Sequence, residues 1–146
     1  MREKFLYHLQ NNSPICKFFN IEALECAAGY GKARMPLEEN QINGLGMAHG
    51  GALFTLADIA MVLAVVGNGS HCVTLSSHVS YLNPAKNGPV VAEAVLISES
   101  AKIVHVEVNI KDAENAPVCR CNFIAYKKPV NDALGHGFEQ NSPHAA

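Results

Sequence analysis

Regular alternation of apolar and polar residues marks the second half of the chain as β-structure. In residues 102–111 four β-branched side chains fall on one face, Val104, Val106, Val108 and Ile110. Residues 118–127 also bring one set to a common face, Cys119, Cys121, Phe123 and Ala125. Residues 72–82 alternate in part and residues 89–98 are mostly apolar, and each segment is expected to form a further strand. The short connections NPAKNG, ESA and DAENAP predict that neighbouring strands run antiparallel.

The long apolar stretch at residues 50–66 predicts a helix that is buried on most sides. Its only polar side chains are Thr55 and Asp58, so it is apolar nearly all round. Before it we expect a short helix at about 3–10 and a strand over 22–35 that bends at its glycines. A single sheet must bury its apolar face, and the central helix is the element able to cover it. The predicted fold class is therefore α+β, a curved antiparallel sheet wrapped around one long helix.

The chain is predicted to be a single domain over residues 1–128. With 146 residues, 49% of them hydrophobic, it can bury a sizeable core without disulfides. Residues 129–146 have no periodicity and are expected to be a flexible tail. The loop that runs from residue 36 to the start of the helix is long, and such loops inside compact domains are usually functional.

Charge and composition exclude several classes of partner. The net charge is −2 and the basic residues are scattered, which argues against binding to nucleic acid. The N-terminus has no signal-peptide apolar region. The apolar run 51–66 is short for a membrane span, and Asp58 at its centre would cost about 2.5–3.5 kcal/mol on an insertion scale. We expect a soluble, cytoplasmic protein without a membrane partner.

The five cysteines indicate a reducing compartment, because their number is odd and they form no regular framework. Cys119 and Cys121 would share one face of a strand, where a buried free thiol behaves as a small apolar side chain. No second pair of ligands occurs at the spacing of a zinc site. We therefore expect no metal site.

Asp58 is the least expected residue of the central helix, because an unpaired buried carboxylate costs several kcal/mol. One interpretation is structural: a basic side chain from a strand pairs with it. The other is chemical: the carboxylate is a general base or nucleophile. We favour the chemical interpretation, since perturbed carboxylates cluster at functional sites.

The sequence His49-Gly50-Gly51 lies where this helix begins. Unpaired N–H groups at a helix N-terminus, unscreened by side chains, can bind a carbonyl oxygen, although a plain glycine-rich helix start is the alternative. Gly50 and Asp58 are separated by about 12 Å along the helix and by about 80° around it. They cannot act on the same carbonyl within one chain. Either one of the two residues plays no part in the reaction, or the site joins Gly50 of one chain to Asp58 of another. We predict the second arrangement, in a two-fold homodimer.

Two segments carry a family resemblance, NGLGMAHGGALFTLAD (43–58) and SYLNPAK (80–86). Over roughly residues 15–127 the chain resembles the hotdog-fold acyl-CoA thioesterases of the phenylacetate-pathway (PaaI-like) kind. The resemblance implies a hotdog fold, paired into dimers and often into tetramers, with each active site drawn from two subunits.

The resemblance also implies roles for individual residues. Asp58 would be the base or nucleophile, the Gly50 N–H would polarise the thioester carbonyl, and Asn43 would assist. His49 would shape the same pocket. A strand hydroxyl would hold the attacking water, and it aligns with Thr74, although Ser76 and Ser77 are close.

Each of these assignments has a structural alternative. Asn43 could cap a turn, Thr74 could be ordinary strand sequence, and His49 could be a satisfied structural histidine. Lys86 could meet a CoA phosphate or simply be solvated. The substrate pocket is expected to include Gly51, Phe54 and Met61.

The function indicated is hydrolysis of an aryl- or medium/long-chain acyl-CoA thioester. Asp58 would activate a water or attack directly to form an anhydride, and the sequence does not choose between them. No cofactor is expected, because CoA enters as part of the substrate. Two alternatives remain: a hotdog dehydratase or hydratase, and a non-catalytic acyl-CoA sensor.

Overall fold

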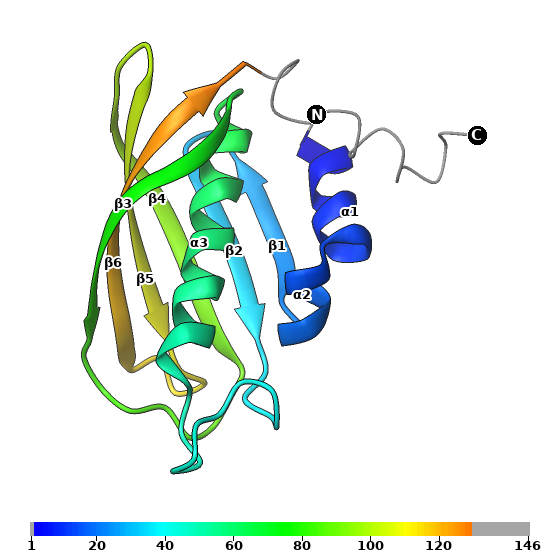
Figure 1. The fold of residues 1–146 in the computed structure, drawn as a ribbon, viewed down its shortest axis with the longest axis vertical. Coiled ribbons are helices and arrows are strands. Elements are labelled where there is room, and N and C mark those ends of the chain that lie inside the picture. Colours follow the sequence, from blue (N-terminus) through cyan, green and yellow to red (C-terminus); the bar gives the residue numbers. More distant parts are fainter. Residues whose placement is uncertain (1, 130–146) are drawn as a thin grey trace.

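The computed structural model describes residues 2–129 and shows one helix lying across the concave face of a six-stranded sheet (Figure 1). This is the hotdog fold, and the predicted α+β class is confirmed. The elements in chain order are α1 (Arg2–Asn12), α2 (Pro14–Phe19), β1 (Glu22–Ala27), β2 (Tyr30–Met35), α3 (Gly50–Gly67), β3 (His71–Tyr81), β4 (Val90–Glu99), β5 (Ile103–Lys111) and β6 (Pro117–Lys128).

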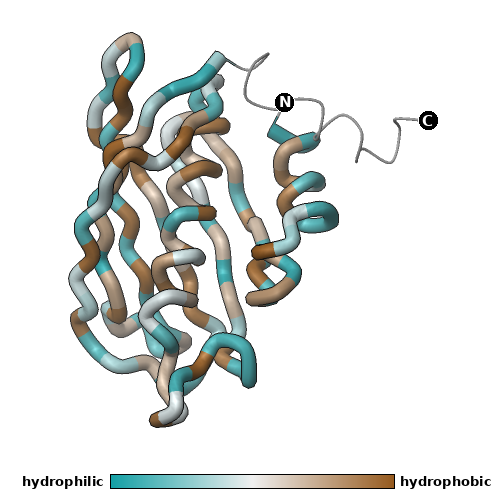
Figure 2. Tube along the Cα trace, in the orientation of Figure 1, coloured by the Kyte–Doolittle hydropathy of each residue, from teal (hydrophilic) through white to brown (hydrophobic). Residues whose placement is uncertain are grey.

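The strands with the clearest alternation, β5 and β6, each bury one face in the core that they share with α3. The inward residues of β5 and β6 are buried as predicted, Val104, Val106, Val108, Ile110, Cys119, Cys121, Phe123 and Ala125. In Figure 2 apolar colours recur along the helix and along the strands beneath it. α3 is long and apolar enough to cross a membrane, but 67% of it is buried inside the fold, as in the core helix of a soluble protein.

The predicted single strand over 22–35 is wrong, because this segment is a hairpin of β1 and β2. The chain reverses at Gly29, whose φ of +68° is open to glycine but strained for other residues. Gly31 then lies directly under α3, where a Cβ would collide with the carbonyl oxygen of Ala60. The glycines therefore turn the chain and let the helix approach the sheet closely.

The sheet order β1-β2-β4-β5-β6-β3 differs from the order along the chain. All pairs are antiparallel as predicted, but β3 pairs with β6 and not with its sequence neighbour β4. Three strand spacings of about 4.8 Å separate β3 from β4, and the residues between them can span that distance. A short connection therefore fixes the direction of the next strand without making it adjacent, and β3 is left at the edge of the sheet.

A β-bulge in β3 sets which of its side chains face α3. The register shifts between Thr74 and Ser76, so Leu75 is an extra residue. Thr74 lies opposite Ala125, and Tyr81 lies opposite Cys119, both of which are buried. Because opposed residues share a face, Thr74 and Tyr81 both point inward, whereas regular alternation would separate them.

The described elements run from α1 to β6, and the single domain over residues 1–128 stays a prediction. The predicted tail, 129–146, lies outside the described residues apart from Pro129.

Candidate active site

The loop before α3 is held in place by a buried glutamine that the sequence reasoning missed. The side chain of Gln41 donates to the Phe19 carbonyl at 2.6 Å and accepts from the Glu38 N–H at 2.9 Å. Its backbone carbonyl accepts from the His49 N–H at 2.8 Å. Gln41 therefore ties α2, the loop and the start of α3 together, and nothing in the local pattern of the loop distinguishes this residue.

His49 caps the N-terminus of α3. Its Nδ1 accepts a hydrogen bond of 2.9 Å from the Gly51 N–H. In the neutral imidazole the proton therefore sits on Nε2. Gly50 is the first residue of the helix, so its N–H has no partner within the helix, and no hydrogen bond among the described residues uses it as a donor. The Gly50 N–H is therefore a backbone donor at the helix start without a partner among the described residues.

The side-chain oxygen of Asn43 caps a turn, which was the structural alternative for this residue. Its Oδ1 accepts from the Leu45 N–H at 2.9 Å and from the Met47 N–H at 3.1 Å, which fixes a turn in the loop. Within residues 2–129 no hydrogen bond is made by its Nδ2. The turn therefore holds the amide in place and leaves its NH₂ group as an available donor.

Asp58 is half-buried and accepts a hydrogen bond of 2.7 Å from the Thr74 hydroxyl. Burial raises the pKa of the Asp58 carboxyl above its ordinary value, and the hydrogen bond from Thr74 partly opposes this. None of the ion pairs among the described residues includes Asp58. The basic partner required by the structural interpretation is therefore not found in the described part of the protomer.

Cys72 adjoins this carboxylate on the inner face of β3. Its Sγ lies 3.7 Å from the Met61 Sδ. Burial, with a contribution from the Asp58 charge, raises the pKa of the Cys72 thiol to about 12. The thiol is therefore protonated and poorly nucleophilic at neutral pH, and the candidate reacting group remains Asp58.

Tyr81 is a second residue that sequence reasoning missed. Its hydroxyl donates to the Gly50 carbonyl at 2.9 Å. It lines a hollow of about 240 Å³ at the start of α3 together with Asn43, Met47, Ala48, Gly50, Leu53, Leu82, Asn83, Pro84 and Ala85. The bulge in β3 hid it, because regular alternation from Thr74 puts residue 81 on the outer face.

The other predicted pocket residues have different surroundings. Gly51 is exposed at the helix start, and Phe54 packs against Phe123 with ring centroids 5.6 Å apart. Met61 is fully buried in the core, so the protomer offers a ligand no access to it. Lys86 is exposed in the connection after β3. The 240 Å³ hollow includes two of the predicted catalytic residues, Gly50 and Asn43, and none of these four predicted pocket residues.

The two halves of the site lie at different points along the same helix and strand. β3 runs beside α3 in the opposite direction, with Tyr81 against Gly50 and Thr74 against Asp58. Within one protomer the free Gly50 N–H and the Asp58 carboxylate therefore stay about two turns of helix apart.

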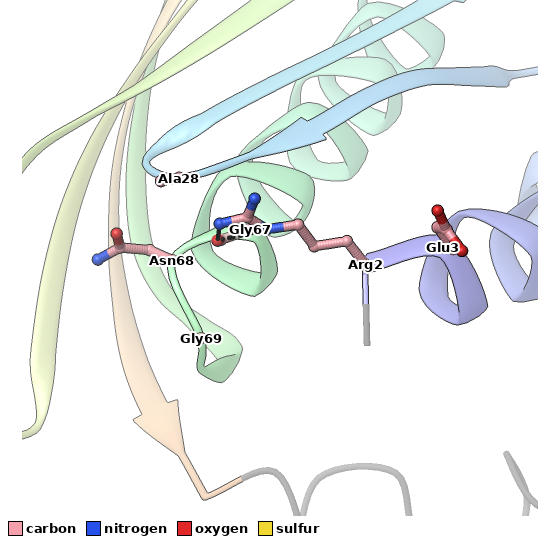
Figure 3. A pocket seen from close by; sticks show the side chains of 6 residues that line it. All are labelled: Arg2, Glu3, Ala28, Gly67, Asn68 and Gly69. Atoms are coloured by element: carbon pink, nitrogen blue, oxygen red, sulfur yellow. Dashed lines mark hydrogen bonds between the residues drawn. The ribbon is translucent and has the colours of Figure 1, made fainter.

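A larger hollow, of about 560 Å³, lies at the far end of α3 (Figure 3). There the Arg2 guanidinium donates twice to the Gly67 carbonyl, from Nε at 3.0 Å and from Nη2 at 2.6 Å. A cation bonded to the last carbonyls of a helix is a C-terminal cap, favoured by the helix dipole. This hollow is lined by Arg2, Glu3, Ala28, Gly67, Asn68 and Gly69, and it contains none of the candidate catalytic residues.

Cys119 and Cys121 point into the core with their sulfur atoms 3.7 Å apart. In the described part of the chain, no group of three histidine, cysteine, aspartate or glutamate side chains is placed to hold a metal ion.

Comparison with known proteins gives a consistent set of matches. Residues 45–119, just over half of the chain, match the family model described as "Thioesterase superfamily". The chain is 24% identical to acyl-coenzyme A thioesterase PaaI of Escherichia coli over 94 residues, which cover 64% of this chain and 67% of that protein. The solved structure of the E. coli PaaI protein has a TM-score of 0.79 at 21% identity, covering 87% of this chain and 94% of that one.

A hypothetical thioesterase protein from Streptococcus pneumoniae, solved with coenzyme A, has a TM-score of 0.73 at 27% identity. The match covers 77% of this chain and 91% of that chain. The same protein has been solved with an aspartate replaced by alanine and with a threonine, 16 positions further along, replaced by alanine.

Proposed function

Since the chain belongs to the thioesterase superfamily and is a thioester hydrolase of PaaI-like hotdog type, we propose that it hydrolyses acyl-CoA with Asp58 as the reacting carboxylate. The Gly50 N–H of the partner subunit binds the thioester oxygen. The observation that carries this proposal is a half-buried carboxylate in the core helix, with a Thr74 hydroxyl as its partner and no basic residue paired with it in the described region.

The comparison with S. pneumoniae supports both residues. Asp58 and Thr74 are 16 positions apart, the same spacing as the aspartate and the threonine replaced in that thioesterase. That protein was solved with coenzyme A, which supports CoA as the carrier of the acyl group here. The aryl or medium/long-chain nature of the acyl group is proposed from the family resemblance.

The shared site follows from the edge strand. β3 has one unpaired edge, and it exposes two apolar side chains, Val73 at 46% and Leu75 at 57%. An exposed, long edge strand is a template for pairing with another chain. If β3 pairs antiparallel with β3 of a second copy, the two α3 helices run in opposite directions, and Gly50 of one approaches Asp58 of the other.

The chemistry can follow either of two routes. In the first, Asp58 takes a proton from a water held by Thr74, and the water oxygen attacks the thioester carbon. In the second, the carboxylate attacks that carbon, an acyl anhydride forms as the C–S bond breaks, and water then hydrolyses the anhydride. In both, the Gly50 N–H stabilises the oxyanion, Asn43 Nδ2 can add a second donor, and the products are a carboxylic acid and the CoA thiol.

Neither route needs a metal or an organic cofactor, and CoA enters as part of the substrate. We also propose that the protein is cytoplasmic and that two dimers associate into a tetramer. A dehydratase or a non-catalytic acyl-CoA sensor has less support, because the named relatives are thioesterases.

Replacing Thr74 with valine is expected to shift the acid limb of the activity profile. The Thr74 hydroxyl lowers the pKa of Asp58, which burial has raised. Activity requires the ionised carboxylate and is lost as the pH falls through its pKa. Without the hydroxyl the pKa rises further, so kcat/KM should begin to fall at a higher pH than in the wild type. The measurement is kcat/KM as a function of pH. Ser76→Ala is the control, because Ser76 faces the other side of β3. An acid limb that does not shift in Thr74→Val would contradict the assignment of Asp58 as the reacting carboxylate.

The experiment that tests the shared site is subunit mixing. Asp58→Asn and Gly50→Pro chains carry different affinity tags, are co-expressed, and the heterodimer is isolated by both tags. If each site takes one residue from each chain, one site of the heterodimer contains both defects and the other contains neither. The heterodimer should then recover about half of the wild-type turnover, although both parent homodimers are inactive.

The assay is release of free thiol from hydroxyphenylacetyl-, benzoyl-, hexanoyl- and palmitoyl-CoA, and the preferred ester reports the acyl class. An inactive heterodimer made from inactive parents would show that the two residues act within one chain. A wild type that binds these esters without hydrolysing any of them would contradict acyl-CoA hydrolysis itself.

A further inference from the structure

Two side chains from different elements hold the same peptide group at the start of α3. The peptide that joins Gly50 to Gly51 offers one carbonyl and one N–H. The carbonyl accepts from the Tyr81 hydroxyl at 2.9 Å. The N–H donates to the His49 Nδ1 at 2.9 Å. The peptide plane is thereby fixed at both of its polar ends.

The position of this peptide matters because the residues on both sides of it are glycines. Two consecutive glycines have more accessible backbone conformations than any other residue pair. The Gly50 N–H lies on the adjoining peptide and can stabilise an oxyanion only if its direction is set before the substrate arrives. The peptide that carries the Gly50 N–H is held through the His49 carbonyl, which accepts from the Leu53 N–H at 3.0 Å. Fixing the Gly50–Gly51 peptide as well limits the rotation between the two peptide planes, and so limits the rotation available to the Gly50 N–H.

The Tyr81 ring packs against the backbone of Gly50, although the residue is 55% exposed to solvent. A Cβ added to Gly50 would lie 3.1 Å from the Cζ and hydroxyl oxygen of Tyr81, so the ring already rests against the backbone. Partial burial raises the pKa of the Tyr81 phenol, which keeps the hydroxyl protonated as a donor. Tyr81 lies on the inner face of β3 only because the bulge at Leu75 shifts the register of the strand.

We propose that Tyr81 is a positioning residue of this thioesterase: with His49 it clamps the Gly50–Gly51 peptide and so orients the Gly50 N–H toward the thioester oxygen. This inference rests on the proposed role of Gly50. It assigns Tyr81 to the chemical step and not to the binding of CoA, because its hydroxyl is bonded to the protein backbone.

The first test replaces Tyr81 with phenylalanine, which keeps the ring and removes only the hydroxyl. The loss of one neutral hydrogen bond should lower kcat and the single-turnover rate about 5- to 10-fold. The KM and the dissociation constant for free CoA should stay within twofold. Tyr126→Phe is the matched control, because the hydroxyl of this strand tyrosine makes no hydrogen bond in the described part of the chain.

The second test uses the other half of the clamp. His49→Ala removes the acceptor for the Gly51 N–H, whereas His49→Asn restores an N-cap acceptor and should recover part of the lost kcat. Since both residues hold one peptide, the double variant Tyr81→Phe/His49→Ala should lose less than the product of the two single losses. The His49 pair also tests the clamp should Tyr81→Phe fail to fold, as judged by circular dichroism.

Three results would overturn the clamp. They are a Tyr81→Phe enzyme with wild-type kcat, a loss confined to KM and CoA affinity, and single losses that multiply in the double variant. An Asp58→Asn enzyme that keeps full activity would instead contradict the proposed catalytic mechanism, so the two failures are distinguishable.

Discussion

Asp58→Asn is expected to lower kcat by 100-fold or more, about 2.7 kcal/mol of transition-state stabilisation. The amide keeps the shape of the side chain and can still pair with the Thr74 hydroxyl, but it can neither accept a proton from water nor form an anhydride. The loss should appear equally in kcat and kcat/KM if the carboxylate acts only in the transition state. The measurement is steady-state release of thiol from the preferred acyl-CoA.

The same substitution is expected to make the protein more stable at neutral pH. Burial raises the pKa of Asp58 in the folded state, so the ionised carboxylate destabilises the fold above that pKa and the penalty disappears in acid. Asp58→Asn should therefore melt at a higher temperature than the wild type at pH 7, with the difference shrinking as the pH is lowered. An inactive variant with a lowered melting temperature at pH 7 would indicate that Asp58 has a structural partner after all.

Gly50→Pro is expected to lower kcat about 100- to 1000-fold, the usual effect of removing one oxyanion donor. Gly50 is the first residue of α3, where proline is tolerated because the N–H has no intrahelical partner. The preceding residue, His49, has φ −71° and ψ 133°, which is the conformation that a following proline requires. The substitution therefore removes the N–H while leaving the helix in place.

Gly50→Ala is the matched control for this prediction. Alanine and proline both add a Cβ, which meets the Tyr81 ring at 3.1 Å, but alanine keeps the N–H. The difference in kcat between the two variants therefore measures the contribution of the Gly50 N–H, separately from the steric effect of the added Cβ. Equal activities would show that the Gly50 N–H takes no part in the reaction.

Local patterns were sufficient to predict the main elements. The helix expected over 50–66 is Gly50–Gly67, because an apolar run of that length without glycine or proline in its interior has few other stable forms. β5 and β6 followed from their period of two. The hairpin within 22–35 was missed, since a glycine in a strand pattern is compatible with a bend or with a reversal, and the local sequence is nearly the same for both.

Asn43 and Tyr81 show why the site was harder to predict than the fold. Asn43 was given two alternative roles, and the structure shows that its oxygen accepts the hydrogen bonds of the turn while its NH₂ group has no partner within residues 2–129. Tyr81 could not be recognised, because a single extra residue at Leu75 reverses which face every later side chain of β3 occupies. The bulge is defined by pairing with residues of β6 that lie about fifty positions further along the chain.

The sequence by itself determined the class of fold, the central helix with its one carboxylate, and the separation of about 12 Å between Gly50 and Asp58, because these depend on local periodicity and helix geometry. Only the tertiary structure decided the order of the strands, the edge position of β3, the Thr74–Asp58 hydrogen bond and the contact of Tyr81 with Gly50. The physical reason is that strand order and register are settled by long-range pairing and burial, for which a stretch of sequence carries no local signal.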